Sequence, residues 1–498
     1  MDAPDTLPQP LDTRTCEQAR LSRDARFDGL FFTAVTSTHI YCRPVCPAPS
    51  PKAANVRYYA SAAAAEADGF RPCLRCRPEL APGNDVWQRG EHAVARALTL
   101  IEHGELEHGS VDTLAARLDL GARQLRRLFV EHVGVPPIRV HTTRRLLFAK
   151  QLLTETAMPV TEVAMAAGFG SLSRFNAAFA QANRIAPREL RRLPRAPAGA
   201  PLVLKLGYRP PYDFPALLAF LRGRALPGVE AVDEASYARV FGDPAKPSWL
   251  RVSAGAPDEH ALRLEIHGVP PGGLLTVVTR LRRMFDLDAA PQAIAAAFRR
   301  DAVLGPLVRR HPGQRLPGGW DGFEIAVRAI LGQQVSVAAA RTLAARVVER
   351  FGTPLAASPQ PGLAKLFPTA AQLAEADLGA LGITTARAAT IRGVAQALLD
   401  GRIDFRPEQP LDTFVERWVA LPGIGAWTAH YMAMRGLSHP DAFPAADLIL
   451  RRAAAPGGDA LGTRAMEQRA EAWRPWRAYA VMHLWRSVGE APKTKAAR

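Results

Sequence analysis

Hydrophobic residues recur at helical spacing in two neighbouring stretches of the chain, residues 111–137 and 160–187. In each stretch a first amphipathic segment stops at a short break and a second segment follows, and the break of the first stretch is Asp119–Gly121. The second segments align at an offset of fifty, with the pairs Leu125 and Phe175, Phe129 and Phe179, and Pro137 and Pro187. This self-similarity predicts a duplicated helix-turn-helix whose halves are joined by a long helix over RRLLFAKQLLTET.

A different pattern begins after residue 200. Short alternating stretches such as WLRVSA and LRLEIHG predict β-strands, and from about residue 291 the spacing becomes helical again. Pro and Gly without periodicity mark RRLPRAPAGAPL as a linker and NDVWQRG as a weaker break. We expect a multidomain protein, mainly α-helical with one β-containing segment. The expected parts are a small domain over 1–84, the helix-turn-helix domain over 88–193, a linker over 194–200, a β-rich α+β domain over 201–290, and a helical domain over 291–490.

The composition fits several globular domains, and its one strong bias is an excess of basic over acidic residues. A chain of 498 residues is long enough for roughly three to four domains. Its start, MDAPDTLPQP, lacks a basic or apolar run, and no window approaches the ~18 apolar residues of a membrane span, so we expect a cytoplasmic protein without membrane attachment. The formal net charge of +16 favours a polyanionic partner, DNA or RNA first, although a genome that favours Arg and Ala codons would produce part of this bias.

Four of the five cysteines form two close pairs, Cys42-x3-Cys46 and Cys73-x2-Cys76, with 26 residues between the pairs. Two such pairs can converge on the tetrahedron that Zn²⁺ with four thiolates requires, and in a reducing cytoplasm this outranks two disulfides. We therefore predict one Zn²⁺ held by these four cysteines, and no organic cofactor. A purely structural zinc clip is the plain alternative. Cys16 lies outside the motif, and we interpret it as an ordinary thiol.

The sequence around the cysteines, FFTAVTSTHIYCRPVCPAPS and NVRYYASAAAAEADGFRPCLRCRPEL, resembles the N-terminal domain of the Ada methylphosphotriester sensors over residues 10–82. In that family the first of the four cysteines is both a zinc ligand and the methyl acceptor, which implies this double role for Cys42. Zinc keeps the thiol deprotonated at neutral pH, so a ligand can still act as a nucleophile. We expect Arg43 to contact the anionic backbone that flanks the damaged phosphate.

The repeated helical region resembles the AraC-type DNA-binding domain over residues 90–193, and AAGFGSLSRFNAAF matches its second signature. Core roles are expected for Leu125, Leu128, Phe129, Phe175 and Phe179. The opposite face of the two presumed recognition helices is expected to reach base edges or phosphates in the major groove, through Arg123, Gln124, Arg127, Ser173, Arg174 and Asn176. A solvated side chain is the alternative for each of these, and the two helices are expected about one DNA turn, ~34 Å, apart.

Near the C-terminus, LPGIGAWTA predicts a helix-hairpin-helix in which Gly423 and Gly425 permit the tight turn. The N–H groups that open the next helix can then bind a phosphate. Asp447 follows 22 residues after Gly425, in FPAADL. Together with FEIAVRAILGQQVSVAAARTLAARVVERFG and PWRAYAVMHLW, these motifs resemble the hairpin-plus-aspartate glycosylases. With the β-rich part included, as a scaffold, the resemblance is to 3-methyladenine DNA glycosylase II.

That resemblance implies that a damaged base is flipped out of the duplex into a stacking pocket. Trp427 and Tyr431 are four residues apart on one helix face, and Trp485 matches the family's third pocket aromatic. Electron-rich rings attract a cationic alkylated purine by ~0.5–2 kcal/mol each. Asp447 would stabilise the oxocarbenium-like sugar and orient or deprotonate the water. The alternatives are a helix N-cap before LILRR for Asp447 and core packing for the aromatic side chains.

Two further positions bear on the mechanism. Superfamily members that also cut the DNA backbone carry a lysine where this chain has Trp427, so a Schiff base is unavailable here and simple hydrolysis of the base is expected. The family's apolar wedge, which fills the gap left by the flipped base, falls at Gln334 in LGQQVS. A glutamine can still occupy that space and hydrogen-bond to the orphan base.

Together the resemblances imply a bifunctional alkylation-response protein. Methyl transfer to Cys42 would switch on transcription, and the C-terminal half would hydrolyse the N-glycosidic bond of alkylated bases. Expected partners are methylated and promoter double-stranded DNA and RNA polymerase, in the bacterial cytoplasm at the nucleoid. No cysteine follows Cys76, so O6-guanine repair by a second acceptor cysteine is not expected. The main rival is a regulator whose C-terminal half binds damaged DNA without turnover.

The charge of the zinc cluster predicts a switch. Zn²⁺ with four thiolates is formally −2, and methylation of Cys42 would leave −1, so a DNA-facing surface would lose negative charge and its affinity for DNA should rise. We expect the methylated protein to bind one promoter duplex more tightly than the unmethylated protein in a mobility-shift titration at fixed salt. Equal affinities would contradict the switch.

Overall fold

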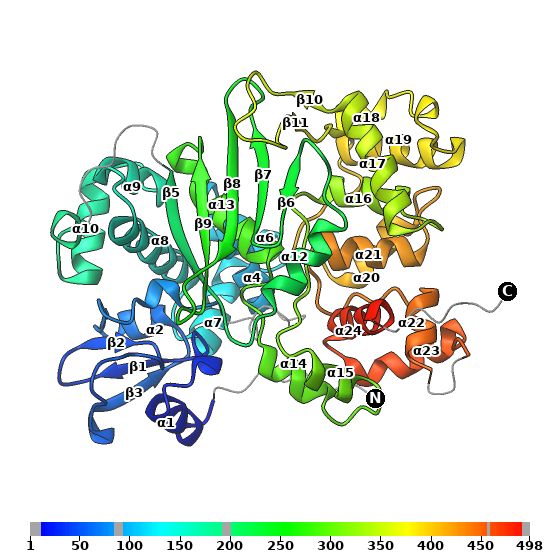
Figure 1. Cartoon of the computed structure of the whole chain (residues 1–498). Helices are drawn as coiled ribbons and strands as arrows, with labels where there is room; N and C mark the ends of the chain where they lie inside the picture. Colours follow the sequence, from blue (N-terminus) through cyan, green and yellow to red (C-terminus); the bar gives the residue numbers. More distant parts are fainter. Residues whose placement is uncertain (1–10, 84–92, 192–200, 456–458, 491–498) are drawn as a thin grey trace. The chain divides into compact units, whose positions relative to one another are not determined.

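The computed structural model describes residues 11–83, 93–191, 201–455 and 459–490 (Figure 1). These residues form two compact units. The first unit contains the described residues up to Pro210, together with Ser248–Arg282 and Leu287–Ala290, and the remaining described residues form the second unit. No described helix is both long and apolar enough to cross a lipid bilayer.

Two of the expected domain boundaries lie outside the described residues, namely the break at 84–90 and the linker over 194–200. The expected β-rich part, 201–290, contributes strands to both units. The expected class is confirmed, because the chain is mainly helical, has a β-containing segment and carries a four-cysteine cluster.

The N-terminal part of the first unit is a small four-stranded sheet in the order β3-β1-β2-β4. β1 pairs antiparallel with β2 and β3, whereas β2 and β4 are parallel. Their register, Tyr41 opposite Pro72, places the next residue of each strand, Cys42 and Cys73, side by side. The elements are α1 (Thr13–Leu21), η1 (Ala25–Phe27), β1 (Phe32–Val35), β2 (Ile40–Cys42), η2 (Ala53–Asn55), β3 (Val56–Tyr59), α2 (Ala62–Ala67), β4 (Arg71–Pro72) and η3 (Pro78–Leu80).

The predicted duplication is present as two helix-turn-helix halves. The second helix of each half ends in a left-handed residue at the same offset of fifty, Gly134 (φ 83°) and Arg184 (φ 54°). A proline then begins the following helix in both halves, at Pro137 and Pro187. The elements are α4 (Ala93–Glu102), α5 (Glu105–His108), α6 (Val111–Ala116), α7 (Ala122–Val133), α8 (Pro137–Glu155), α9 (Val160–Ala166), α10 (Leu172–Asn183) and α11 (Pro187–Leu190).

The connecting helix α8 also packs against the cysteine-bearing domain. Lys150 is 1% exposed, and its ammonium group donates to the Glu79 carboxylate and to the Cys73 carbonyl at 3.3 Å. Arg77 pairs with Glu155 near the end of α8 at 2.8 Å. Because a buried ammonium needs a carboxylate partner, this helix can pack here only with Glu79 in place.

The first unit is completed by antiparallel strands and by a buried arginine. β9 pairs with β5 and with β8, and buried and half-buried residues alternate along β8, which confirms the two strands that the sequence pattern predicts. Arg209 is fully buried and donates to five backbone carbonyls, including that of Asp28 at 2.8 Å. The added elements are β5 (Leu202–Gly207), β8 (Pro247–Ala254), β9 (Ala261–His267) and α13 (Leu274–Met284), the last of which runs into the second unit.

The second unit is a helical body around α16 (Gly322–Leu331), which packs against α17, α19 and α21 and buries most of its residues. Arg239 and Arg328 form a buried ion-pair network with Glu230 and Glu324, which locks α16 to the hairpin of β6 and β7. The remaining elements are α12 (Phe214–Arg222), β6 (Glu230–Val232), β7 (Ser236–Gly242), η4 (Pro271–Gly273, of the first unit), α14 (Pro291–Phe298), α15 (Leu304–Arg310), α17 (Val337–Phe351), β10 (Thr353–Pro354), β11 (Lys365–Leu366), α18 (Ala370–Ala374), η5 (Gly379–Leu381), α19 (Thr385–Leu399), α20 (Leu411–Val419), α21 (Ala426–Gly436), α22 (Leu448–Ala453), α23 (Thr463–Ala470), η6 (Glu471–Trp473) and α24 (Arg477–Glu490).

The buried pair of Lys150 and Glu79 predicts a large stability effect. Glu79→Gln is expected to lower the free energy of unfolding of the first unit by about 3–5 kcal/mol, because the ammonium would remain buried without its carboxylate. The matched control is Arg26→Gln, which breaks the more exposed pair of Arg26 with Asp24 and should cost less than about 1 kcal/mol. Urea unfolding followed by circular dichroism measures both losses, and equal losses would contradict the prediction.

Candidate functional site

The four paired cysteines converge on one point of the small sheet. Cys42 ends β2, Cys73 follows β4, and Cys46 and Cys76 lie in the turns after these two residues. Their four Sγ atoms all lie within 4.8 Å of one another. Since thiolates around Zn²⁺ at ~2.3 Å are separated by about 3.8 Å, the set fits one tetrahedral Zn²⁺. The predicted ligands are therefore brought together by the fold.

The two pairs differ in their surroundings. The backbone N–H of Arg43 donates to Cys76 Sγ at 3.3 Å, and that of Arg75 donates to Cys73 Sγ at 3.4 Å. Cys73 and Cys76 are each 6% exposed, whereas Cys42 and Cys46 are half-buried residues. Each sulfur of the second pair thus accepts a backbone N–H, which favours its thiolate form.

Cys16 lies apart from the cluster, on α1. It is 2% exposed, and burial raises the pKa of its thiol to about 11. Such a thiol is protonated and unreactive at neutral pH, which agrees with its interpretation as an ordinary thiol.

Arg43 has a different environment from the one expected. Its guanidinium makes a bidentate pair with the Asp28 carboxylate, with Nε to Oδ1 at 2.9 Å, and donates to the Cys76 carbonyl at 3.0 Å. Both side chains are largely buried, at 13% and 3% exposure. The guanidinium is therefore held inside the domain, where it braces the loop between Cys42 and Cys46. The expected contact of Arg43 with the DNA backbone stays a prediction.

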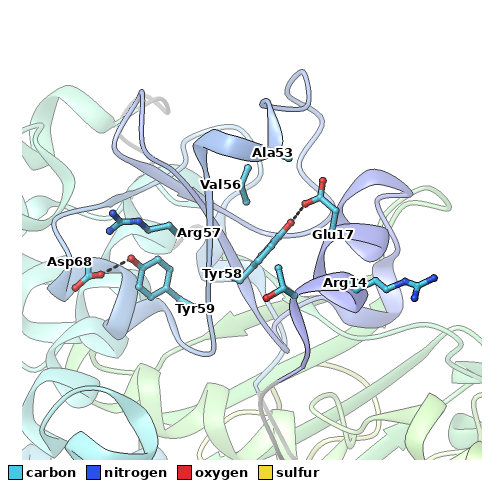
Figure 2. A pocket seen from close by; sticks show the side chains of 9 residues that line it. Arg14, Glu17, Ala53, Val56, Arg57, Tyr58, Tyr59 and Asp68 are labelled. Atoms are coloured by element: carbon cyan, nitrogen blue, oxygen red, sulfur yellow. Dashed lines mark hydrogen bonds between the residues drawn. The ribbon is translucent and has the colours of Figure 1, made fainter.

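A surface hollow of the same domain lies away from the cysteines. Figure 2 shows that residues of α1 and β3 line it, and β3 is an edge strand separated from β2 by β1. Its two carboxylates already have partners, Glu17 with the Tyr58 hydroxyl and Asp68 with the Tyr59 hydroxyl at 2.6 Å. The lining residues include no thiol or imidazole, so this hollow holds none of the predicted metal ligands.

The two presumed recognition helices, α7 and α10, show the same pattern of burial. Leu125, Phe129, Phe175 and Phe179 are fully buried, and Leu128 packs half-buried against the first core. The side chains that the sequence assigned to DNA are all exposed: Arg123, Gln124, Arg127, Ser173, Arg174 and Asn176. This arrangement leaves them free to reach a major groove, and their contacts with DNA and the ~34 Å spacing stay predictions.

The hairpin between α20 and α21 depends on its first glycine. Gly423 has φ +84°, and a Cβ there would lie 2.0 Å from Thr390 Oγ1 of α19. Gly425 is the N-cap of α21, and no atom lies within 4 Å of the position of its Cβ. No side chain caps the helix at this residue. The N–H groups of the first turn of α21 are thus open toward solvent, as a phosphate-binding helix start requires.

Asp447 and the aromatic side chains form one hydrogen-bonded cluster. Trp427 Nε1 donates to Asp447 Oδ2 at 3.0 Å, and Trp485 Nε1 donates to Asp447 Oδ1 at 3.3 Å. The Trp427 and Tyr431 rings are stacked, with centroids 5.5 Å apart and planes at 13°, and Tyr431 lies 6.3 Å from Trp485. All four side chains are half-buried. They therefore form one aromatic cluster around a fixed carboxylate.

Asp447 is also the N-cap of α22, where Oδ1 accepts from the backbone N–H of Leu450 at 3.0 Å. The two interpretations of this residue, helix cap and pocket carboxylate, hold at the same time. The cap fixes the carboxylate relative to α22, while the indoles fix it relative to α21 and α24.

The wedge position lies in the turn between α16 and α17. Gln334 is exposed and has φ +55°, a conformation that is uncommon for a residue other than glycine. Its neighbour Gln333 was not predicted from the sequence. The Gln333 side chain donates to the Gly423 carbonyl at 3.0 Å and to Thr428 Oγ1 at 3.1 Å, so it ties the wedge turn to the hairpin.

The sequence also gave no indication of two arginines at the pocket. Arg435 donates to the Tyr431 hydroxyl at 3.3 Å, and the guanidinium of Arg224, two residues after α12, lies over the same Phe220 ring as that of Arg435. Arg435 could have been found by continuing the spacing of four from Trp427 and Tyr431 along the helix. Arg224 could not, because only the tertiary fold brings it to α21.

Known protein families match four stretches of the chain. The metal-binding domain of Ada matches residues 15–79, and a helix-turn-helix domain matches residues 114–193. The AlkA N-terminal domain matches residues 203–321, and the HhH-GPD superfamily of base excision DNA repair proteins matches residues 327–478.

Individual proteins resemble the chain over its whole length or over its C-terminal part. A probable bifunctional transcriptional activator/DNA repair enzyme AlkA of Mycobacterium tuberculosis is 40% identical over 483 residues, which is 96% of this chain and 97% of that relative. DNA-3-methyladenine glycosylase 2 of Escherichia coli is 36% identical over 292 residues, 58% of this chain and 98% of the relative. A solved 3-methyladenine DNA glycosylase from Archaeoglobus fulgidus shares the fold, with a TM-score of 0.51 and 21% identity over 58% of this chain and 99% of its own.

The geometry of the hairpin predicts that its two glycines tolerate substitution differently. Gly423→Ala is expected to lower the stability of the second unit by about 2–4 kcal/mol, because the new Cβ would meet Thr390 and would have to adopt a positive φ. Gly425→Ala has open space and an ordinary φ, and should cost less than about 1 kcal/mol. Thermal unfolding of both variants measures the difference, and a tolerated Gly423→Ala would contradict the close approach.

Proposed function

Because the chain belongs to the family of bifunctional transcriptional activators and DNA repair enzymes represented by the mycobacterial relative, we propose that it answers DNA alkylation in two ways. The N-terminal half takes a methyl group from the DNA backbone and activates transcription. The C-terminal half is a DNA glycosylase of the 3-methyladenine type. The observation that carries this proposal is the Asp447 carboxylate, held by the indole N–H groups of two pocket tryptophans.

In the N-terminal half, Cys42 is the proposed methyl acceptor. Cys42, Cys46, Cys73 and Cys76 would hold Zn²⁺, which supplies charge that keeps the sulfurs deprotonated at neutral pH. The Cys42 sulfur attacks the methyl carbon of a methylphosphotriester. The new S–C bond forms as the C–O bond breaks, and the oxygen leaves with the bonding pair as an ordinary phosphodiester anion. Each protein molecule reacts once, since the thioether is stable.

Transcription activation would use the helix-turn-helix halves that share the first unit with the cysteine domain. The exposed faces of α7 and α10 support promoter binding, and α8 packs directly against the loop of Cys73 through Lys150. A change at the metal cluster can therefore reach the DNA-reading domain through one helix. We further propose RNA polymerase as the partner of the activated protein and the nucleoid as its place of work.

In the C-terminal half, the flipped base would enter the pocket of Trp427, Tyr431 and Trp485. A cationic alkylated base stacks favourably on these rings and is already a good leaving group. Asp447 lies where it can stabilise the positive charge that develops on the sugar and can take a proton from the attacking water. The two indole donors and the Leu450 N–H fix the direction of its carboxylate before the substrate arrives.

The residue types in the pocket support simple hydrolysis of the base. Trp427 occupies the position at which lyase relatives carry their lysine, so no amine is available there for a Schiff base. The turn at Gln334 projects from the same unit next to the hairpin and supports its proposed role of filling the gap in the duplex. Gly423 and Gly425 would let the start of α21 bind a backbone phosphate.

The rival function is binding of damaged DNA without turnover. The aromatic pocket alone would serve that function, whereas a carboxylate fixed in its wall has no evident use there. The plain alternative for the N-terminal half is a structural zinc clip, in which Cys42 never reacts.

The two proposed activities should separate by mutation. Asp447→Asn is expected to lower the release of 3-methyladenine from methylated DNA by about 10²–10⁴-fold, the usual share of a positioned acid–base group. The same variant should still gain one methyl group on Cys42 in a mass spectrum after incubation with methylated DNA. Cys42→Ser should still release 3-methyladenine at the rate of the unaltered protein and should gain no methyl group. Undiminished base release by Asp447→Asn, or an unmodified Cys42 in the unaltered protein, would contradict the respective half of the proposal.

A further inference from the structure

Three segments of the second unit meet at Gln333. This residue lies in the turn between α16 and α17 and is half-buried, whereas its neighbour Gln334 is exposed. Its hydrogen bonds join the turn to the hairpin between α20 and α21 and to helix α19. Gln333 is 54 positions from Arg387 of α19 and 90 positions from Gly423 of the hairpin. Only the tertiary fold brings these segments together.

The polar groups of Gln333 are committed to the protein interior. Its side-chain amide has two N–H donors, and Nε2 donates to the Gly423 carbonyl at 3.0 Å and to Thr428 Oγ1 at 3.1 Å. Thr428 itself is 2% exposed. The backbone carbonyl of Gln333 accepts from the Arg387 guanidinium, a charge-assisted bond. The side chain thus anchors the turn to the hairpin, and the carbonyl anchors it to α19.

Helix α19 provides a second link between the same two segments. Thr390 follows Arg387 by three positions, so the two side chains share a face of the helix. Thr390 lies against Gly423, where an added Cβ would be 2.0 Å from its Oγ1. One residue of α19 therefore contacts the turn and another contacts the hairpin. The turn and the hairpin are fixed to each other both directly and through α19.

The outer side of this linked pair carries two different features. At the turn, Gln334 has φ +55° and is followed by Val335 and Val337, which are 37% and 48% exposed. At the hairpin, Gly425 begins α21 without a side-chain cap. Apolar side chains can contact bases that have lost a stacking partner, and free N–H groups can bind a phosphate. An inserting tip and a phosphate-binding point thus share one rigid body.

Base extrusion needs such rigidity. Moving a base out of a duplex costs free energy, because its pair and its stacking are broken. Phosphate binding supplies free energy at the hairpin, whereas the resistance of the stacked bases acts at the turn. A loose turn would yield to the bases. Hydrogen bonds that order the turn before DNA arrives also remove the cost of ordering it on binding.

We propose that Gln333 is a positioning residue for base extrusion, because it holds the Gln334 turn against the phosphate-binding hairpin. This inference rests on the proposed glycosylase function. The side chain of Gln333 donates to the hairpin, whereas the Asp447 carboxylate is held by the indole N–H groups of Trp427 and Trp485. Extrusion of a paired base therefore depends on Gln333, and cleavage of the bond to an extruded base does not.

The test uses two duplexes of one sequence, each with a single 7-methylguanine, a cationic alkylated base. It lies opposite cytosine in the first duplex and opposite an abasic site in the second, where there is no pair to break and no orphan base to fill. Single-turnover release is measured for the full-length protein and for Gln333→Met, which keeps the side-chain length and removes both donors. The variant is expected to lower the ratio of the paired to the unpaired rate by about tenfold, the effect of losing two neutral hydrogen bonds.

A second variant tests the bond itself. Thr428→Val removes one acceptor of the Gln333 amide and should lower the same ratio by a smaller factor. Added to Gln333→Met, it should lower the ratio no further, because the bond is already absent. The matched control is Gln396→Met, also a glutamine change and on α19, where the exposed side chain donates to Asp400 at 2.7 Å. This control should leave the ratio unchanged.

Two results would overturn the inference. An equal loss of release from both duplexes in Gln333→Met would mean that the residue only supports the fold of the unit. An unchanged ratio would mean that the turn needs no bridge to the hairpin. If the unaltered protein releases 7-methylguanine from neither duplex, the glycosylase function itself is wrong, and this inference is wrong with it.

Discussion

The structure depends throughout on giving buried cationic side chains their acceptors. An arginine or lysine in the interior is tolerated only where carboxylates or carbonyls meet it, and this chain buries many of them. Arg43 and Asp28 brace the loop between Cys42 and Cys46. Lys150 and Glu79 hold the connecting helix α8, and Arg239 with Glu324 holds α16, the central helix of the second unit. Other buried arginines are met by neutral acceptors, as Arg209 is by five backbone carbonyls and Arg435 by two backbone carbonyls and the Tyr431 hydroxyl.

Because buried cationic side chains need acceptors inside the fold, the net charge of the chain is not a direct measure of its affinity for DNA. A charge of +16 favours DNA as a partner, and the exposed arginines of α7 support that interpretation. Yet part of the arginine content is structural. Arg43 is the clearest case, since its position beside Cys42 suggests a DNA contact while its guanidinium is occupied by Asp28 and by a backbone carbonyl. Charge counted along a sequence does not distinguish these two uses, because burial is set by the fold.

Asp447 shows how one residue can satisfy two interpretations that seem to exclude each other. A carboxylate has room for several donors, so Asp447 caps α22 with one oxygen and accepts an indole N–H on each oxygen. The cap does not compete with the proposed chemistry. It sets the direction of the carboxylate, and the two tryptophans proposed to stack on a base are oriented by the same group.

The sequence by itself determined the parts and most of the proposed chemical groups. Spacing within single helices and turns specified the duplicated helices, the cysteine ligands, the hairpin glycines and the stacked pair of Trp427 and Tyr431, because these relations are local. Tertiary structure alone decided what surrounds those groups: that Arg43 faces Asp28, that Gln333 ties the wedge turn to the hairpin, and that Arg224 reaches Tyr431. The contacts of Arg43 and Gln333 join residues that are distant in the chain, and no local periodicity encodes which of many arginines will be buried.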